Sequence, residues 1–114
     1  MAIELTDPED TKIVTLARSA RARTRAAEGA CVRDTDGRTY AGATVSLPSL
    51  SISAIGVAVA MAVSSAAAGL EAVAVLGGES VTEADLAAIR DFAGEGVPVF
   101  LAAADGSVAE RVLT

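Results

Sequence analysis

The chain has 114 residues, a formal net charge of −6, and a composition that is 52% hydrophobic but only 3% aromatic. This length fits one domain, residues 1–114, and the acidic balance argues against nucleic acid as the main partner. There is no histidine and one cysteine, Cys31, which excludes a Ser-His-Asp triad, a zinc site of the usual ligands and an internal disulfide. The lone cysteine and an acidic amino terminus predict a cytoplasmic protein without a signal peptide.

The core must be built from small side chains, because most of the apolar residues are Ala and Val. A short chain with such a core is expected to associate with itself through an Ala/Val face. Residues 52–70 carry no charge and could span a bilayer, but they lack the Leu, Phe, Trp and Lys/Arg pattern of a membrane helix. We therefore expect a buried helix and no membrane partner, with a membrane span as the alternative.

The first predicted helix starts at Thr6 or Asp7 and ends near Ala27, before Gly29. Its basic cluster indicates a solvated face, with an anion or subunit contact as the alternative; the cluster comprises Arg18, Arg21, Arg23 and Arg25. A β-hairpin follows over residues 29–45, with its turn at 34–37. Pro48 is expected to end strand pairing. A long apolar helix then starts at Ser49 or Ser51 and ends near Gly69.

The second half predicts a strand at 71–76, a plain turn at Gly77-Gly78 and an amphipathic helix. Ser80 or Thr82 caps this helix, and Gly94 ends it. Two more strands follow at 97–101 and 107–113, joined by a turn. The order α-β-β-α-β-α-β-β predicts an α/β domain with a five-stranded mixed sheet and helices on its faces. The two later helices are crossovers between parallel strands.

Few other residues suggest chemistry. Asp34 and Asp36 share a turn, and Glu83 and Asp85 share the first turn of a helix, so turn chemistry and the helix dipole explain both pairs. Cys31 is expected to be a small buried residue. Tyr40 and Phe100 are expected in the core.

This layout resembles the cytidine deaminase family, in particular its small homo-tetrameric nucleoside-acting branch. Residues 29–66, with the Asp-Gly-Arg turn at 36–38, look like the opening hairpin and first catalytic helix of that family. Residues 80–94 resemble its Pro-Cys-x-x-Cys helix, and 97–106 the strand and turn that follow. The resemblance covers about two thirds of the chain and implies a three-layer α/β/α fold.

The family's catalytic signature is missing. In deaminases a His or Cys and two further Cys hold Zn²⁺, and a Glu transfers protons. An ungapped match implies that the first ligand position falls on Ile55 and the Glu position on Val57. The other ligand positions fall on Thr82 and Asp85. The positions of the sugar-binding Asn and Glu fall on Thr44 and Ser46.

These replacements imply a fold that is retained and a reaction that is lost, with no catalytic residue, no zinc and no other cofactor. The six positions would remain only as an inherited cleft, and the protein would be a homodimer or homotetramer with a structural or partner- or ligand-binding role. One alternative is a divergent enzyme that uses Asp85, Thr82, Thr44 and Ser46. Another is a nucleoside-binding protein without chemistry.

Overall fold

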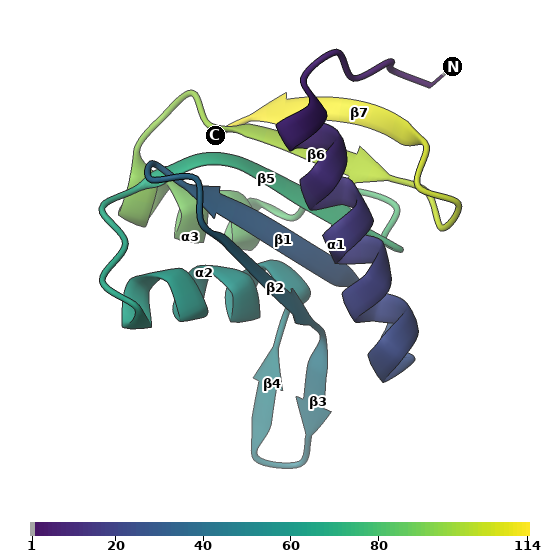
Figure 1. Cartoon of the computed structure of the whole chain (residues 1–114). Coiled ribbons are helices and arrows are strands. Elements are labelled where there is room, and N and C mark those ends of the chain that lie inside the picture. Colours follow the sequence, from purple (N-terminus) through teal and green to yellow (C-terminus); the bar gives the residue numbers. More distant parts are fainter. Residues whose placement is uncertain (1) are drawn as a thin grey trace.

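A computed structural model describes residues 2–114 as three helices and seven strands. Their bounds in chain order are α1 (Pro8–Thr24), β1 (Gly29–Asp34), β2 (Thr39–Ala43), β3 (Val45–Leu47), β4 (Leu50–Ile52), α2 (Ala54–Ser64), β5 (Leu70–Leu76), α3 (Glu83–Ala93), β6 (Pro98–Ala102) and β7 (Val108–Leu113). Five strands form one sheet in the order β2-β1-β5-β6-β7. The helices cover both of its faces (Figure 1).

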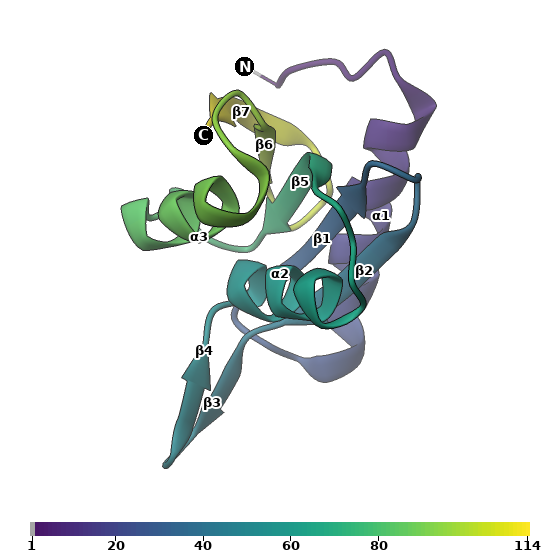
Figure 2. The ribbon, with the colours of Figure 1, turned by 90° about the vertical axis from the view of Figure 1, so that its left-hand side faces the viewer.

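The sheet is mixed, as predicted. β5 and β6 are parallel, and every other neighbouring pair in this sheet is antiparallel. α3 connects β5 to β6, and α2 connects β2 to β5, which run in the same direction on either side of β1. α1 covers one face, while α2 and α3 cover the other (Figure 2). The predicted α/β/α architecture is confirmed.

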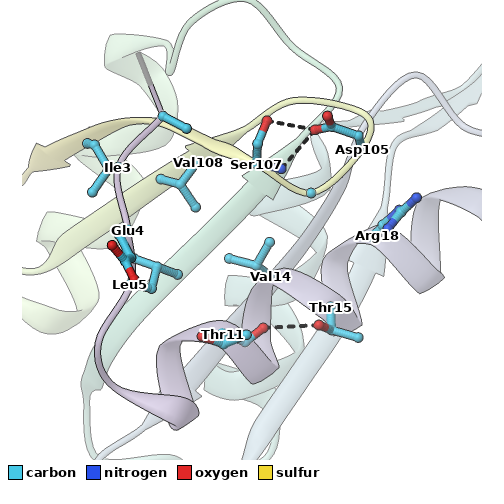
Figure 3. Close-up of a pocket in the computed structure, with 12 residues that line it drawn as sticks. Ile3, Glu4, Leu5, Thr11, Val14, Thr15, Arg18, Asp105, Ser107 and Val108 are labelled. Atoms are coloured by element: carbon cyan, nitrogen blue, oxygen red, sulfur yellow. Dashed lines mark hydrogen bonds between the residues drawn. The ribbon is translucent and has the colours of Figure 1, made fainter.

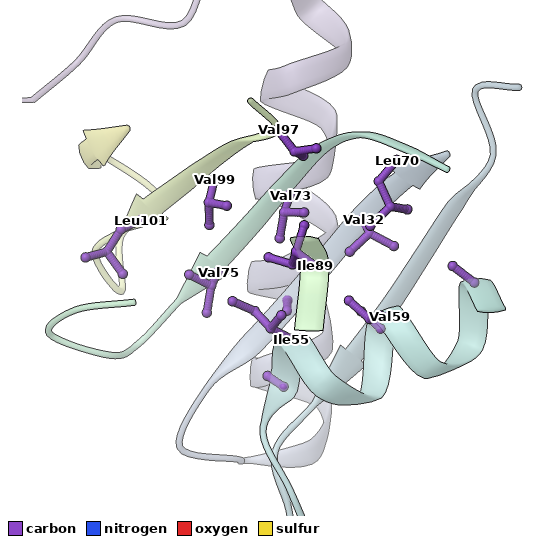
Figure 4. Packing of buried hydrophobic residues seen from close by; sticks show 14 residues of the cluster. Val32, Ile55, Val59, Leu70, Val73, Val75, Ile89, Val97, Val99 and Leu101 are labelled. Carbon is purple, nitrogen blue, oxygen red and sulfur yellow. The ribbon is translucent and has the colours of Figure 1, made fainter. Parts of the chain in front are cut away.

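Alternation along the central strands divides the apolar residues between two cores. In β1, Ala30 and Val32 face α2 and α3, whereas Cys31 faces α1. Figure 4 shows the first cluster, in which valines of three strands meet Ile55 of α2 and Ile89 of α3. Cys31 is fully buried as predicted, and burial raises the pKa of its thiol to about 11. A thiol in that state is inert.

The hairpin between β1 and β2 is held by a buried carboxylate. Asp34 accepts hydrogen bonds from the backbone N–H of Asp36, the backbone N–H of Arg38 and the Tyr40 hydroxyl, each at 2.9 Å. Burial alone would raise the pKa of Asp34, but these hydrogen bonds outweigh it and the pKa lies below its usual value. Asp34 is therefore a turn residue, as expected from the sequence.

Two boundaries of the predicted apolar helix are wrong. Pro48 does not end strand pairing, because β3 and β4 form a two-stranded hairpin with Pro48 and Ser49 at its tip. The helix starts only after Ser53, whose side chain accepts a hydrogen bond from the N–H of Gly56, and it ends at Ser64. No helix within residues 2–114 combines the length and the apolar character needed to cross a membrane.

The capping residues predicted for the other two helices agree more closely with the structure. Asp7 caps α1 and Thr82 caps α3, each accepting a backbone N–H of the first turn, and Gly94 follows the last turn of α3. α1 ends at Thr24 rather than near Ala27, because Arg25 takes the left-handed conformation with φ 55°. Its N–H then bonds the carbonyl of Arg21 and closes the last turn.

Candidate functional site

The starts of α2 and α3 are joined by a hydrogen bond between side chains. The Ser53 hydroxyl donates to Oδ1 of Asp85 at 2.6 Å while accepting the N–H of Gly56 at 2.9 Å. Thr82 Oγ1 accepts the N–H of Asp85 at 3.2 Å. Each of these polar groups therefore has a partner within the protein, and the Asp85 carboxylate is tied to the facing helix.

A second carboxylate, that of Glu28, lies close to this pair. Glu28 directly precedes β1, and its backbone is bonded to Thr44: the N–H of Glu28 donates to Thr44 Oγ1 at 3.0 Å, and the N–H of Thr44 donates to the Glu28 carbonyl at 3.1 Å. Its side chain lies against Gly78, where a Cβ would collide with Oε2 of Glu28. A side chain at this point would have to displace the Glu28 carboxylate.

Two effects act on Glu28 in the same direction. Burial raises the pKa of Glu28, and the negative charge of Asp85 raises it further. Glu28 and Asp85 therefore form a pair of carboxylates in which Glu28 holds its proton more tightly than it would in an unfolded chain.

The structure does not bring the six predicted positions together in one cleft, and their burial differs. Ile55 is 1% exposed and belongs to the core rather than to a cleft. Val57 is half-buried over β2, where a Cβ on Gly42 would lie 2.7 Å from Val57 Cγ1. Ser46 is exposed on β3. Only Thr82 and Asp85 are brought together, while Thr44 is bonded to Glu28.

Glu28 and Ser53 are the residues that sequence reasoning missed. Ser53 precedes the helical Ala54, but Ser49 and Ser51 offer the same capping chemistry, so the sequence does not single it out. Glu28 carries a weaker signal, namely an isolated charge at the edge of a buried strand. Its approach to Gly78 depends on tertiary packing.

The donor set at the three positions matched to the family's ligands does not fit zinc. Ile55 offers only carbon atoms, Thr82 already accepts an N–H, and Asp85 is hydrogen-bonded to Ser53. Among residues 2–114, no three His, Cys, Asp or Glu side chains are grouped so that they could hold a metal ion. Tetrahedral zinc needs several thiolate, imidazole or carboxylate ligands around one point.

Replacing Glu28 with Gln is expected to increase the free energy of unfolding at pH 7. An acid whose pKa is raised by folding binds its proton more tightly in the folded state, so its ionisation destabilises the protein as pH rises through that pKa. The amide removes this effect. The gain should disappear at a pH below the usual glutamate pKa, where the wild-type side chain is neutral. Urea titrations at both pH values measure it.

The matched control for this substitution is Glu79→Gln in the loop after β5, next to Gly78, where the side chain is exposed. It makes the same change of charge and should leave the stability nearly unchanged at both pH values. A loss of stability in Glu28→Gln at pH 7 would contradict the assigned effect of Asp85 and burial.

An apolar groove lies on the outer side of α2. It has a volume of about 440 Å³ and is lined by Val45, Ile52, Val57, Ala60, Met61, Ser64 and Ser65. The β3–β4 hairpin forms one wall and projects away from the sheet (Figure 1). Leu47 and Leu50 on this hairpin are 60% and 49% exposed.

Comparison with known proteins supports the resemblance seen in the sequence. The family described as "Cytidine deaminase-like" matches residues 6–106. No curated protein matches the chain significantly.

Solved structures of cytidine deaminases share the fold. The enzyme from Burkholderia pseudomallei is 20% identical, with a TM-score of 0.76 over 90% of this chain and 89% of that one. The enzyme from Mycobacterium leprae is 16% identical, with a TM-score of 0.71 over 93% of both chains. The enzyme from Mycobacterium tuberculosis is 24% identical, with a TM-score of 0.69 over 82% and 85%. Taken with the match over residues 6–106, this places the chain in the cytidine deaminase-like family.

Proposed function

We propose that this chain is a single-domain, non-catalytic cytidine deaminase-like protein, which acts in a homo-oligomer as a structural or binding component. The observation that carries the proposal is the burial of Ile55, which at 1% exposure occupies core space at the first ligand position of the family. The Ser53–Asp85 hydrogen bond supports it, because the one carboxylate left at a ligand position already has a partner. Val57 in place of the catalytic Glu can neither accept nor donate a proton.

Zinc content and cytidine turnover of the pure protein test this proposal. Protein expressed in zinc-supplemented medium is expected to contain far less than one zinc per chain and to produce no uridine above the blank. The cytidine deaminase from Mycobacterium tuberculosis, prepared and assayed in the same way, is the positive control. Stoichiometric zinc, or turnover that co-purifies with the chain, would overturn the non-catalytic assignment.

A second copy of this chain is the partner that fits the groove beside α2. Four of the six exposed large hydrophobic residues of the described chain lie on the hairpin or on α2, namely Leu47, Leu50, Met61 and Val63. No charged residue occurs between Arg38 and Glu71, so nothing in this segment repels an identical surface. An apolar patch of this kind is typical of subunit contacts.

Light scattering after size exclusion measures the association. The wild type is expected to be a dimer or larger, and Leu50→Glu combined with Met61→Glu should shift it towards monomer. Leu113→Glu is the control, since Leu113 is also exposed but lies on β7, at the opposite edge of the sheet from β2. A monomeric wild type, or dissociation by the control alone, would contradict this interface.

Nucleoside binding without chemistry is the second candidate, and the Glu28–Asp85 pair favours it. Half-buried carboxylates beside two helix starts could accept hydrogen bonds from hydroxyl or amino groups of a nucleoside. A thermal-shift panel of nucleosides tests this candidate, with Asp85→Ala as the variant that should lose any shift. A flat panel would argue against it.

A further inference from the structure

The C-terminal half of α1 carries arginines that line one hollow on the face of the sheet opposite α2 and α3. This arginine pocket has a volume of about 460 Å³ and is lined by Arg18, Arg21 and Arg25, together with Leu76 at the end of β5 and Ala104 in the turn after β6. Arg18 and Arg21 are three residues apart on the same side of α1, and Arg25 directly follows the helix in the left-handed conformation. No acidic residue lines the pocket.

Arg21 is held in position by the protein itself. Its Nε donates to the Ala27 carbonyl at 3.1 Å. The side chain also lies against Gly77, where a Cβ would be 2.7 Å from Nε and where φ is +106°. A guanidinium has five N–H donors, so fixing Nε leaves four donors on the Nη atoms in a defined orientation. Such preorganisation lowers the entropy lost when an anion binds.

Within the described chain, no carboxylate forms a salt bridge with the pocket arginines, but the positive charge of Arg18 acts on Asp105: hydrogen bonds from Ser107 lower the pKa of Asp105, and Arg18 lowers it further. Within residues 2–114 the salt bridges are Arg33–Asp10 and Arg90–Glu83, and neither involves the pocket arginines. Basic residues in the last turn of a helix also complement its dipole. That effect fades beyond the last turn, so it does not account for Arg18, which lies about two turns before Arg25.

Arg18 also borders a second hollow, which we call the N-terminal pocket. It has a volume of about 490 Å³ and lies between α1, the segment before it and the β6–β7 turn. Figure 3 shows Val14 of α1 facing Val108 of β7, with Leu5 beside them, so this part of the lining is apolar, whereas Thr11, Thr15 and Ser107 make other parts polar. The segment over the pocket is fixed by the N–H of Ile3, which donates to the Val108 carbonyl at 2.6 Å.

Two carboxylates determine which end of a ligand would lie in which pocket, if the ligand extends from one pocket to the other. Glu4 and Asp105 border the N-terminal pocket, and Asp105 accepts hydrogen bonds from the N–H and the hydroxyl of Ser107 at 2.9 and 2.6 Å. These charges would repel an anion at that end. An anionic group must therefore lie at the arginine pocket, and the apolar part beyond Arg18.

We propose that Arg18, Arg21 and Arg25 bind the phosphate group of a small molecule whose apolar portion occupies the N-terminal pocket. Guanidinium groups match phosphate oxygens through paired hydrogen bonds, and several of them around one hollow favour a dianion over a carboxylate. This site lies on the α1 face, so it does not depend on the fate of the zinc positions or on the interface beside α2.

Calorimetric titration with hexyl phosphate, inorganic phosphate and hexanol in 150 mM salt tests the site. Hexyl phosphate is expected to bind saturably and at least about tenfold more tightly than inorganic phosphate, because burying methylene groups adds affinity. Hexanol alone should not bind. Equal affinities for the two phosphates would overturn the role of the N-terminal pocket, and no saturable binding of either would overturn the site.

Arg18→Gln and Arg25→Gln should each weaken hexyl phosphate binding at least about tenfold, the range expected for a lost charge-assisted hydrogen bond. Arg23→Gln is the matched control, since Arg23 is exposed on the same helix and does not line the pocket. It removes the same charge and should leave the affinity unchanged. Thermal melts check that each variant is folded.

Equal weakening in Arg23→Gln would reduce the effect to general electrostatics and overturn the site. Co-sedimentation with phosphatidic acid vesicles separates a soluble ligand from a membrane lipid. The protein should stay in the supernatant, and its sedimentation with the vesicles would overturn the small-molecule assignment.

Discussion

Ile55→Ala is expected to lower the free energy of unfolding by about 2–5 kcal/mol, the range for removing a large buried aliphatic side chain. Ile55 is 1% exposed and is among the largest fully buried side chains of the chain. It lies where α2 meets the sheet and α3, so little of the resulting cavity can be filled by relaxation (Figure 4). Urea denaturation followed by circular dichroism measures the loss.

Val57→Ala is the matched control, two residues further along the same helix. Val57 is only half-buried and borders the groove beside α2, so truncation should cost less than half as much. Equal losses at the two positions would contradict a core role for Ile55. A large loss at Ile55 alone would show that this side chain is one of the main contributors to the stability of the core.

The five strands of the main sheet and the order of the helices between them could be predicted from the sequence because their signals are local. Gly37 in the first hairpin has a φ of +84°, which glycine adopts readily. The Asp34 carboxylate accepts a hydrogen bond from the backbone N–H of Asp36 in the same turn. The apolar stripe from Leu86 to Phe92 is typical of a helix on a sheet. Such turns and periodicities need no information from distant parts of the chain.

The β3–β4 hairpin and the true length of α2 could not be predicted in the same way. An uninterrupted apolar run fits a strand or a helix, and periodicity does not separate them. Pro48 predicts a barrier to strand pairing, but a proline at the tip of a hairpin has no ladder hydrogen bond to lose. Register and burial, which depend on tertiary contacts, decide the outcome.

The candidate site was only partly predictable for a related reason. The resemblance led to Thr82 and Asp85, which do lie together, but it also grouped Ile55 and Ser46, which lie in the core and at the surface. Ser53, the residue that actually meets Asp85, comes from 32 positions earlier in the chain. No local pattern connects those two side chains.

Asp10→Ala is expected to destabilise the protein by about 3–5 kcal/mol, the range for removing one partner of a buried ion pair. Arg33 lies on β1 under α1, and its Nη1 is 3.0 Å from Oδ1 of Asp10. The two side chains are 9% and 20% exposed. Nη1 of Arg33 makes no hydrogen bond within residues 2–114, so Asp10 is matched to it as an ion pair alone, and the substitution leaves a buried positive charge without that pair. Chemical denaturation at neutral pH measures this loss.

Glu9→Ala controls for charge and for the helix dipole, because Glu9 is exposed in the same first turn of α1. Its effect should stay within about 1 kcal/mol. The double variant Asp10→Leu with Arg33→Met removes both charges and fills similar volume, and its stability should return to the wild-type value or exceed it. If it remained as unstable as Asp10→Ala, the loss would come from packing around Asp10. Recovery would show that two apolar side chains can take the place of the ion pair without loss of stability, whereas removal of one partner alone destabilises the protein.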